Sequence, residues 1–544
     1  MSNSPSSSES KSPSDASSSD FSRTFKYLLA TQLCSRGIPF IVNAVILRNF
    51  LKVEDFALYG VQFPLFVNCV LFLSREGFRR ACLRQDMKSD GTSTEENIAK
   101  IMKFAWLVPP CGIIITTAAS GFVFWWKGLS FSDPYGQGIL ITGGACILEL
   151  LAEPLYILSQ NLLLLKLRLA VETAATFFRC ITTAVLFGMR ADMEKEIIFA
   201  LSQTAYGLCL FSGYWVYFLR FRPYRSSALF PFRAKNKKNY DGELLKMCEL
   251  FALQSCVKLI LQEGQNFVLL QWATYYNQAV YGFVDNLGSL VVRMVFLPFE
   301  ESTYATFARS ASGKDPDKDK RLGSSLTEAL KLVLLIGLIF MAFGPSYAYS
   351  LIRLVYGQKW SDGEASTALG YYCFYIIVLA MNGTSEAFVH AVAKKNQLLW
   401  SNLPSVLITI IYVVLNILLV NSAGAVGLIL ANSLNMILRI LYSGAFIKHY
   451  FQDSSSFSFY KCLPEGWKVL LFSGITTIIS ERIFLDRKNF WATFVVHFTI
   501  GVACFCTSAF VIYRHERSLI NKIIPINRIF PSINKTVRFR DHSD

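Results

Sequence analysis

The sequence predicts an all-α polytopic membrane protein with about 14 transmembrane helices, arranged as two six-helix bundles related by a parallel repeat plus two C-terminal helices. The first observation is composition: of 544 residues, 53% are hydrophobic and only 17% are charged, and the mean hydropathy is +0.38. Soluble globular proteins carry roughly 25% charged residues, so this chain cannot cover several soluble domains with polar surface. The other two observations are the recurrence of long apolar windows and the placement of basic residues between them.

Each predicted element is an apolar window long enough to cross a membrane, which takes about 20 residues. Fourteen such windows follow one another: 27–47, 56–78, 104–126, 138–162, 169–189, 196–219, 247–271, 279–303, 327–350, 367–391, 399–420, 424–447, 467–485 and 490–513. The windows 56–78, 247–271 and 279–303 contain charged residues, and a re-entrant arrangement is the alternative for these three.

Lysine and arginine are distributed unevenly between the two sides of these windows. If the N-terminus is cytosolic, 36 of them lie in cytosolic segments and 10 on the opposite side. This bias follows the positive-inside rule, and one helix more or fewer would scramble it. Both termini are therefore predicted to be cytosolic. The net charge of +15 reflects mainly this bias, so we expect no nucleic-acid partner.

A weak internal duplication divides the chain. Positions 28–60 align without gaps on the segment starting at Leu250, with nine identities in 33 positions. The repeat contains six windows, an even number, so the two halves have parallel topology and are related by an axis along the membrane normal. The predicted parts are a disordered Ser-rich tail (1–22), an N-terminal six-helix lobe (23–220), a basic cytosolic linker (221–246), a C-terminal six-helix lobe (247–448), two extra transmembrane helices (449–513) and a basic cytosolic tail (514–544).

The windows contain ionisable residues, which are costly in a membrane and usually face a cavity or pair with one another. The basic candidates for a functional site are Arg36, Arg75, Arg79, Lys258, Arg293 and Arg439. The acidic candidates are Glu76, Glu153, Glu263, Asp285, Glu300, Glu301 and Glu386. The competing interpretation is that buried Arg–Glu pairs only fix helix packing.

Other classes of function have little support in the sequence. Most of the 13 cysteines lie in apolar runs, and there is no C-x-x-C pair or Cys/His cluster, so we expect no metal and no cofactor. The predicted non-cytosolic loops are short, which argues against an enzyme with an aqueous catalytic domain. There is no Walker A motif, so the sequence does not support direct use of ATP.

Eight stretches together resemble the eukaryotic Rft family of endoplasmic-reticulum oligosaccharide-lipid translocation proteins. They are residues 43–48, 75–82, 149–154, 262–264, 285–290, 300–302, 382–386 and 431–436. The match runs in order from about residue 25 to 515; the Ser-rich head departs from the family, as does Ala152, where glycine is expected.

The resemblance implies membership of the multidrug/oligosaccharidyl-lipid/polysaccharide exporter superfamily, whose fold is two six-helix bundles plus an extra helix pair. It also implies a role in N-glycosylation: moving, or assisting the movement of, a dolichyl-diphosphate-linked oligosaccharide from the cytosolic to the luminal leaflet. The basic candidates would then bind the diphosphate, and the acidic candidates would contact sugar or balance charge. Membrane lipid, this glycolipid and proteins of the pathway are the expected partners of a monomer. The alternatives are an ion-coupled small-molecule exporter and a non-transporting scaffold of the same pathway.

Overall fold

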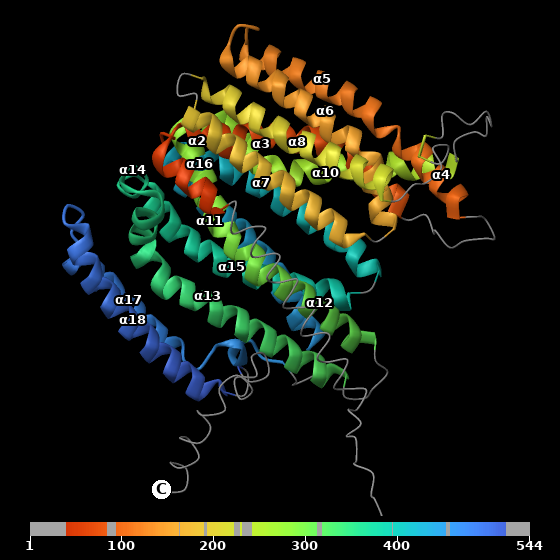
Figure 1. Ribbon diagram of the computed structural model, residues 1–544. Coiled ribbons are helices and arrows are strands. Elements are labelled where there is room, and N and C mark those ends of the chain that lie inside the picture. The colour runs from red at the N-terminus through yellow and green to blue at the C-terminus, as the bar shows by residue number, and fades with distance from the viewer. Residues whose placement is uncertain are drawn as a thin grey trace, which may run out of the picture. The chain divides into compact units, whose positions relative to one another are not determined.

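The computed structural model (Figure 1) describes residues 40–83, 94–162, 164–189, 193–221, 229–230, 242–312, 318–393, 395–452, 457–517 and 520. Every regular element in these ranges is a helix, which confirms the predicted all-α fold. All thirteen windows from residue 56 onward coincide with helices. The first window, 27–47, lies mostly outside the described residues. Within the described residues, the helix Phe40–Asn49 overlaps the end of this window.

In the described part of the chain, ten helical segments are long and apolar enough to cross a membrane. They are Asp55–Leu83, Ile98–Lys127, Pro134–Asn161, Lys166–Met189, Lys195–Arg220, Tyr275–Ala308, Lys318–Tyr356, Ala365–Val392, Leu407–Tyr450 and Phe490–His515. The windows 247–271 and 467–485 are helices too, α10 (Gly242–Trp272) and α17 (Trp467–Phe484), but are not among these ten. The total of fourteen spans therefore stays a prediction.

The chain divides into two units, and each is described by itself. Unit 1 comprises, among the described residues, 40–51 and Phe66–Leu259, and unit 2 comprises Lys52–Leu65 and the residues from Ile260 onward. The division of the chain into lobes 23–220 and 247–448, with a linker and two extra helices, remains a prediction.

Unit 1 is built around α6 (Pro134–Asn161), which packs against its neighbours α5 and α8. Its other helices are most of α3 (Phe63–Leu83), α4 (Thr94–Ala105), α5 (Val108–Lys127), α7 (Leu165–Met189), α8 (Lys195–Arg220) and the first part of α10. Apolar side chains of α4, α6, α7 and α8 form its core. Where α8 crosses α6, a Cβ on Gly207 would lie 2.8 Å from the carbonyl oxygen of Ala145. Such close backbone approach at a small residue is typical of membrane helix pairs.

Unit 2 contains the remaining helices. They are α2 (Asp55–Ala57), η1 (Leu58–Gln62), the rest of α10, α11 (Tyr275–Val291), η3 (Val292–Phe296), α12 (Leu297–Ser312), α13 (Lys318–Tyr356), α14 (Gln358–Ser361), α15 (Ala365–Val392), α16 (Lys395–Tyr450), η4 (Phe459–Cys462), α17 and α18 (Phe490–His515). The π-helical turns η1 and η3 fall inside two of the windows that contain charges. Turns of this kind occur frequently at functional sites.

The long helix α16 consists of two helices that meet at a kink. Ala423 and Gly424 have non-helical backbone angles, and Gly424 has a φ of 54°, a left-handed conformation that glycine adopts without steric cost. The kink separates the predicted windows 399–420 and 424–447.

The C-terminal pair α17 and α18 packs along α13 (Figure 1). Lys331 Nζ lies 2.6 Å from Glu516 Oε1 at one end, and Thr477 donates a hydrogen bond of 3.2 Å to the carbonyl of Ala342 in the middle. At the other end the ring of His497, which is 0% exposed, stacks on Tyr347 with a centroid distance of 4.3 Å. An ion pair, a hydrogen bond and a ring stack, at three levels, therefore hold the pair against α13.

The connection between α13 and α15 carries a carboxylate outside the spanning segments. Tyr349 Oη donates a hydrogen bond of 2.8 Å to Asp362, and Arg353 lies 3.7 Å away. Burial alone would raise the pKa of Asp362, but the hydrogen bonds and the arginine charge outweigh it and hold this pKa below its usual range.

Candidate functional site

Among the described residues of unit 1, buried charges gather where α3 meets α6. Arg75 and Arg79 are one turn apart on α3, and Glu149 and Glu153 are one turn apart on α6. Residues four apart share a helix face, so each helix presents two like charges to the other. These four residues are called the Arg–Glu cluster below.

The strongest contact in the Arg–Glu cluster is a two-bond pair. Arg79 donates through Nε to one oxygen of Glu153 and through Nη2 to the other at 2.8 Å. Nη1 of Arg75 lies 3.8 Å from a carboxylate oxygen of both Glu149 and Glu153. The two glutamates are only 4% and 2% exposed. A two-bond guanidinium–carboxylate pair fixes orientation as well as charge, so it sets how α3 and α6 meet.

The network continues onto α7 and α8. Gln203 donates a hydrogen bond of 2.8 Å to Glu149, and its carbonyl oxygen accepts a longer one, 3.5 Å, from Arg179. The Arg179 guanidinium also lies over the ring of Tyr206, 5.4 Å from its centroid. Four helices of unit 1 are thus joined by one polar network.

An aromatic residue closes the other side of this network. The guanidinium of Arg79 lies 4.0 Å from the ring centroid of Tyr156, and Arg168 donates a 2.5 Å hydrogen bond to its hydroxyl. The cavity between these side chains measures about 90 Å³. Small-molecule sites are typically about 300–1,000 Å³, so this cavity can hold water but not a sugar diphosphate.

Unit 2 has its own charged group, around Glu386 of α15. This carboxylate accepts a hydrogen bond of 3.1 Å from Asn382 and lies 3.6 Å from His390 and 3.7 Å from Arg439 of α16. A Cβ on Gly383 would touch the carboxylate of Glu300, which places α12 beside this group. The Glu386 and Arg439 side chains are 37% and 31% exposed, more open than the Arg–Glu cluster.

A separate polar group of unit 2 links α11, α15 and α16. Tyr372 donates a 2.9 Å hydrogen bond to Asp285. Asn432 donates a 3.0 Å bond to Tyr281 and accepts one of 2.5 Å from Tyr412. These side chains place polar hydroxyl and amide groups deep within the helices.

The remaining predicted residues are scattered. Glu76 pairs with Arg80 on its own helix at 2.8 Å, and the Lys258 ammonium is 6.0 Å from the ring centroid of Phe72. Arg293 donates a 2.6 Å bond to Ser289. Glu263 accepts a 2.7 Å bond from Asn266, and Glu301 is exposed. Arg36 lies outside the described residues.

Sequence reasoning found Arg75, Arg79 and Glu153 but did not select Glu149, Arg179 or Gln203 as site residues. The available signal was spacing: two basic residues four apart at the end of the window 56–78, Arg75 inside it and Arg79 just beyond it, and two acidic residues four apart in the window 138–162 predict matching helix faces. The contribution of α7 and α8 had no comparable signal, because a single arginine or glutamine in an apolar window has no partner in the sequence.

The chain matches the family model described as "Rft protein" over residues 21–526. Among similar proteins is the Man(5)GlcNAc(2)-PP-dolichol translocation protein RFT1 of Dictyostelium discoideum, 32% identical over 90% of this chain and 94% of that protein. The protein of the same name from Mus musculus is 31% identical over 91% of this chain and 94% of its own length.

Solved structures with a similar fold are transporters. The lipid II flippase MurJ, in an inward closed conformation, matches with a TM-score of 0.64 at 14% identity, covering 90% of this chain and 99% of that one. An inward-facing multidrug resistance MATE family transporter of the MOP superfamily matches with a TM-score of 0.56 at 14% identity, covering 77% and 96%. These similarities agree with the predicted fold class, and the family match over residues 21–526 establishes that the chain belongs to the Rft protein family.

Proposed function

We propose that this protein moves, or assists the movement of, a dolichyl-diphosphate-linked oligosaccharide from the cytosolic to the luminal leaflet of the endoplasmic-reticulum membrane, for N-glycosylation. The observation that carries the proposal is the similarity, over about nine tenths of the chain, to proteins named for this translocation. A fold like that of a lipid flippase supports it. In this proposal the chain acts as a translocator, not as an enzyme.

The task requires cationic groups for a diphosphate while the dolichol tail stays in lipid. We assign diphosphate contact to Arg36, Lys258, Arg293 and Arg439; of these, Lys258 and Arg293 are exposed and Arg439 is half-buried. Guanidinium groups suit this role because they bind phosphate through two parallel hydrogen bonds. Sugar contacts and charge balance fall to the acidic candidates of unit 2: Glu263, Asp285, Glu300, Glu301 and Glu386.

Arg75 and Arg79 have a different role in this proposal. Both lie against buried carboxylates beside a cavity of about 90 Å³, too small for the head group. They position α3, and Glu153 balances their charge. Glu76 is paired within α3.

The proposal also includes a topology and a cellular setting. The excess of basic residues in alternate loops supports cytosolic N- and C-termini, and the family supports the endoplasmic reticulum. The protein would act as a monomer with membrane lipid and the glycolipid, beside other proteins of the N-glycosylation pathway.

The test is reconstitution of the purified full-length protein in liposomes that contain a dolichyl-diphosphate oligosaccharide. We expect native protein to move the glycolipid faster than empty vesicles do, and Lys258→Ala and Arg36→Ala to slow this movement at unchanged melting temperature. Arg482→Ala, which removes an exposed positive charge outside the proposed set, is the matched control. Movement no faster than in empty vesicles would remove the direct support for translocation.

A scaffold without transport activity is the second candidate, and the paired charges of the Arg–Glu cluster favour it. It predicts that the same variants leave glycolipid movement unchanged while lowering the yield of pathway proteins that copurify. The third candidate function is that of an ion-coupled exporter. If it is correct, a proton or sodium gradient should drive export of small cations in the same liposomes.

A further inference from the structure

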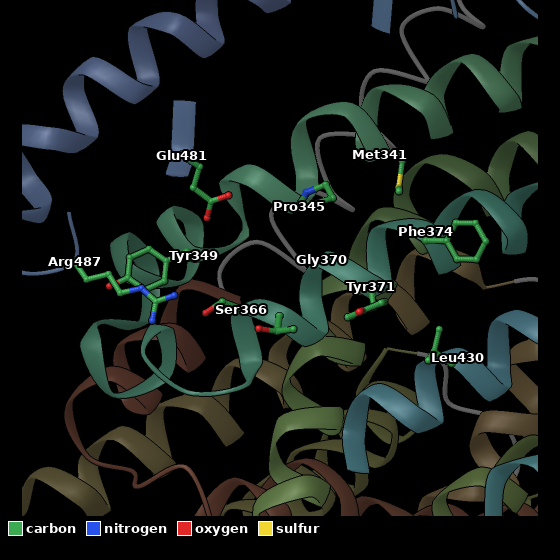
Figure 2. A pocket seen from close by; sticks show the side chains of 11 residues that line it. Met341, Pro345, Tyr349, Ser366, Gly370, Tyr371, Phe374, Leu430, Glu481 and Arg487 are labelled. Atoms are coloured by element: carbon green, nitrogen blue, oxygen red, sulfur yellow. The ribbon is translucent and has the colours of Figure 1, made fainter. Parts of the chain in front are cut away.

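A groove in unit 2 lies between the lobe helices α13, α15 and α16 and the C-terminal helix α17 (Figure 2). Its volume is about 480 Å³, within the range of small-molecule sites, about 300–1,000 Å³. Two of its walls, α13 and α17, are joined by the contacts at three levels described above. The groove involves none of the residues assigned to the proposed translocation.

One end of the groove is polar and charged. Arg487, in the loop after α17, and Glu481, near the end of α17, both line it beside Tyr349 (Figure 2). The Arg487 guanidinium lies 5.1 Å from the ring centroid of Tyr349. The charge of Arg487 acts on the Glu481 carboxylate, although among the contacts of the described residues the two form no ion pair. The mouth therefore offers a positive and a negative group that lie near each other without pairing directly.

The other end of the groove is apolar. Met341 and Pro345 of α13, Phe374 and Tyr371 of α15 and Leu430 of α16 line it, and Figure 2 shows Met341, Phe374 and Leu430 at the side away from Arg487. Met341 and Phe374 are 40% and 37% exposed. A long hydrocarbon chain lying against these side chains would pack on apolar surface that the described residues leave uncovered, and van der Waals contact is what holds apolar groups together inside a bilayer.

We propose that this groove is the binding site of a resident zwitterionic phospholipid, distinct from the transported substrate. Arg487 binds the phosphate of the head group, Glu481 binds its amine, and one acyl chain lies along Met341, Phe374 and Leu430. The charge arrangement favours this class of lipid. An anionic head group without an amine competes with Glu481 for Arg487 and brings no positive charge to that carboxylate, and a polyprenyl diphosphate adds still more negative charge beside it. The bound lipid connects the C-terminal pair to the second lobe.

The experiment purifies the full-length protein from nanodiscs that contain phosphatidylethanolamine and phosphatidylglycerol in equal amounts and measures retained lipid by native mass spectrometry. We expect one phosphatidylethanolamine per protein, and retention about tenfold weaker in Arg487→Glu, because a lost charge-assisted hydrogen bond has an effect of about this size. Lys488→Glu, an identical charge change at the neighbouring exposed position, is the matched control and should retain the lipid.

A second pair of variants tests the acyl-chain end without changing charge. A Cβ on Gly370 would lie 3.7 Å from Pro345, an ordinary contact, so Gly370→Ala should fold and retain lipid. Gly370→Leu places a branched side chain in the groove and should expel the lipid while the protein stays monodisperse.

Three outcomes would overturn the proposal. They are no retained phospholipid in the native protein, equal retention by Arg487→Glu and Lys488→Glu, and displacement of the phospholipid by an equimolar dolichyl phosphate, which would make the groove a substrate site. Because the readout is retained lipid rather than translocation, it is independent of the proposed function.

Discussion

Removing Glu153 should destabilise unit 1 far more than removing its partner Arg79. In Glu153→Leu, Arg79 loses both of its hydrogen bonds to a carboxylate, and a guanidinium cannot shed its charge. In Arg79→Leu, Glu153 keeps Arg75 at 3.8 Å, and a lone carboxyl group can also take up a proton. The two halves of one ion pair are therefore not equivalent.

The magnitudes follow from burial. Breaking a buried pair by removing one partner costs about 3–5 kcal/mol, and we assign this range to Glu153→Leu because Glu153 is 2% exposed. Arg79→Leu should cost about 1–3 kcal/mol, the range for one unsatisfied buried group. The double variant Arg79→Leu/Glu153→Leu leaves neither charge behind. Its loss of stability should be smaller than the sum of the losses in the two single variants by at least about 2 kcal/mol.

The assay is the apparent melting temperature of the purified protein, followed by fluorescence-detected size-exclusion chromatography. A loss of about 3–5 kcal/mol in a unit of this size should lower it by roughly 6–20 °C. The matched control is Glu76→Leu on the same helix, whose pair with Arg80 is 22% and 31% exposed and is worth less than about 1 kcal/mol. Equal shifts for Glu153→Leu and Glu76→Leu, or strictly additive single variants, would refute the reasoning.

Three further expectations concern unit 2. Gly424→Ala should cost about 1–3 kcal/mol, because φ at this position is 54°, a backbone conformation that strains any side chain, and because a Cβ there would lie 2.6 Å from the side chain of Asn277. Gly444→Ala in the same helix, with only a 3.9 Å contact for its Cβ, should not destabilise; equal melting temperatures would contradict this. His497→Phe should keep the ring stacking on Tyr347 but remove the 3.0 Å hydrogen bond between His497 and Ser480, at a position that is 0% exposed. The melting temperature should fall by the equivalent of about 1–3 kcal/mol. An unchanged melting temperature would contradict a structural role for His497. The pKa of Asp362 is lowered in the folded protein, so its contribution to stability is present above the unfolded-state pKa, near 3.9, and is lost as the pH falls through the lower folded-state value. The effect should stay below about 1 kcal/mol, because the Asp362 side chain is 40% exposed. If Asp362→Asn gives the same melting-temperature profile from pH 6 to pH 3 as the native protein, this prediction is contradicted.

Helix existence was predictable because a membrane helix needs a long apolar run, and such runs are visible in any single sequence. Helix boundaries were less predictable than helix existence. The helix α13 already begins at Lys318, well before the predicted window that starts at residue 327, because polar residues prolong a helix beyond its apolar stretch. The kink at Gly424 coincides with a predicted boundary, since a short break separates two apolar windows there. The π-helical turns had no signal, because they depend on packing against other helices.

The candidate site was only partly predictable, because charge in an apolar window shows that a partner or a cavity exists but not which one. Arg79 and Glu153 were both selected, yet their two-bond pair joins positions 74 residues apart. Glu386 and Arg439, also both selected, lie 3.7 Å apart. The polar end of the groove was missed because Glu481 lies in the last turn of α17 and Arg487 in the loop after it, where charged residues are indistinguishable from ordinary helix-end and loop residues.

The Arg–Glu cluster does more than add stability, since well-packed apolar residues often replace a buried ion pair at no cost. Its specific effect is on register. Sliding α3 along α6 by one turn, about 5.4 Å, breaks the observed pairing and leaves Arg75 or Arg79 without a facing carboxylate, at about 2.5–3.5 kcal/mol for a charge inside the membrane. Two leucines remove the part of this penalty that comes from Arg79, while the Arg75–Glu149 contact at 3.8 Å still opposes the shift. The Arg79→Leu/Glu153→Leu variant should therefore show faster hydrogen–deuterium exchange in the part of α3 that contains Arg75, even where its melting temperature approaches that of the native protein, because the shifted register costs less free energy than in the native protein.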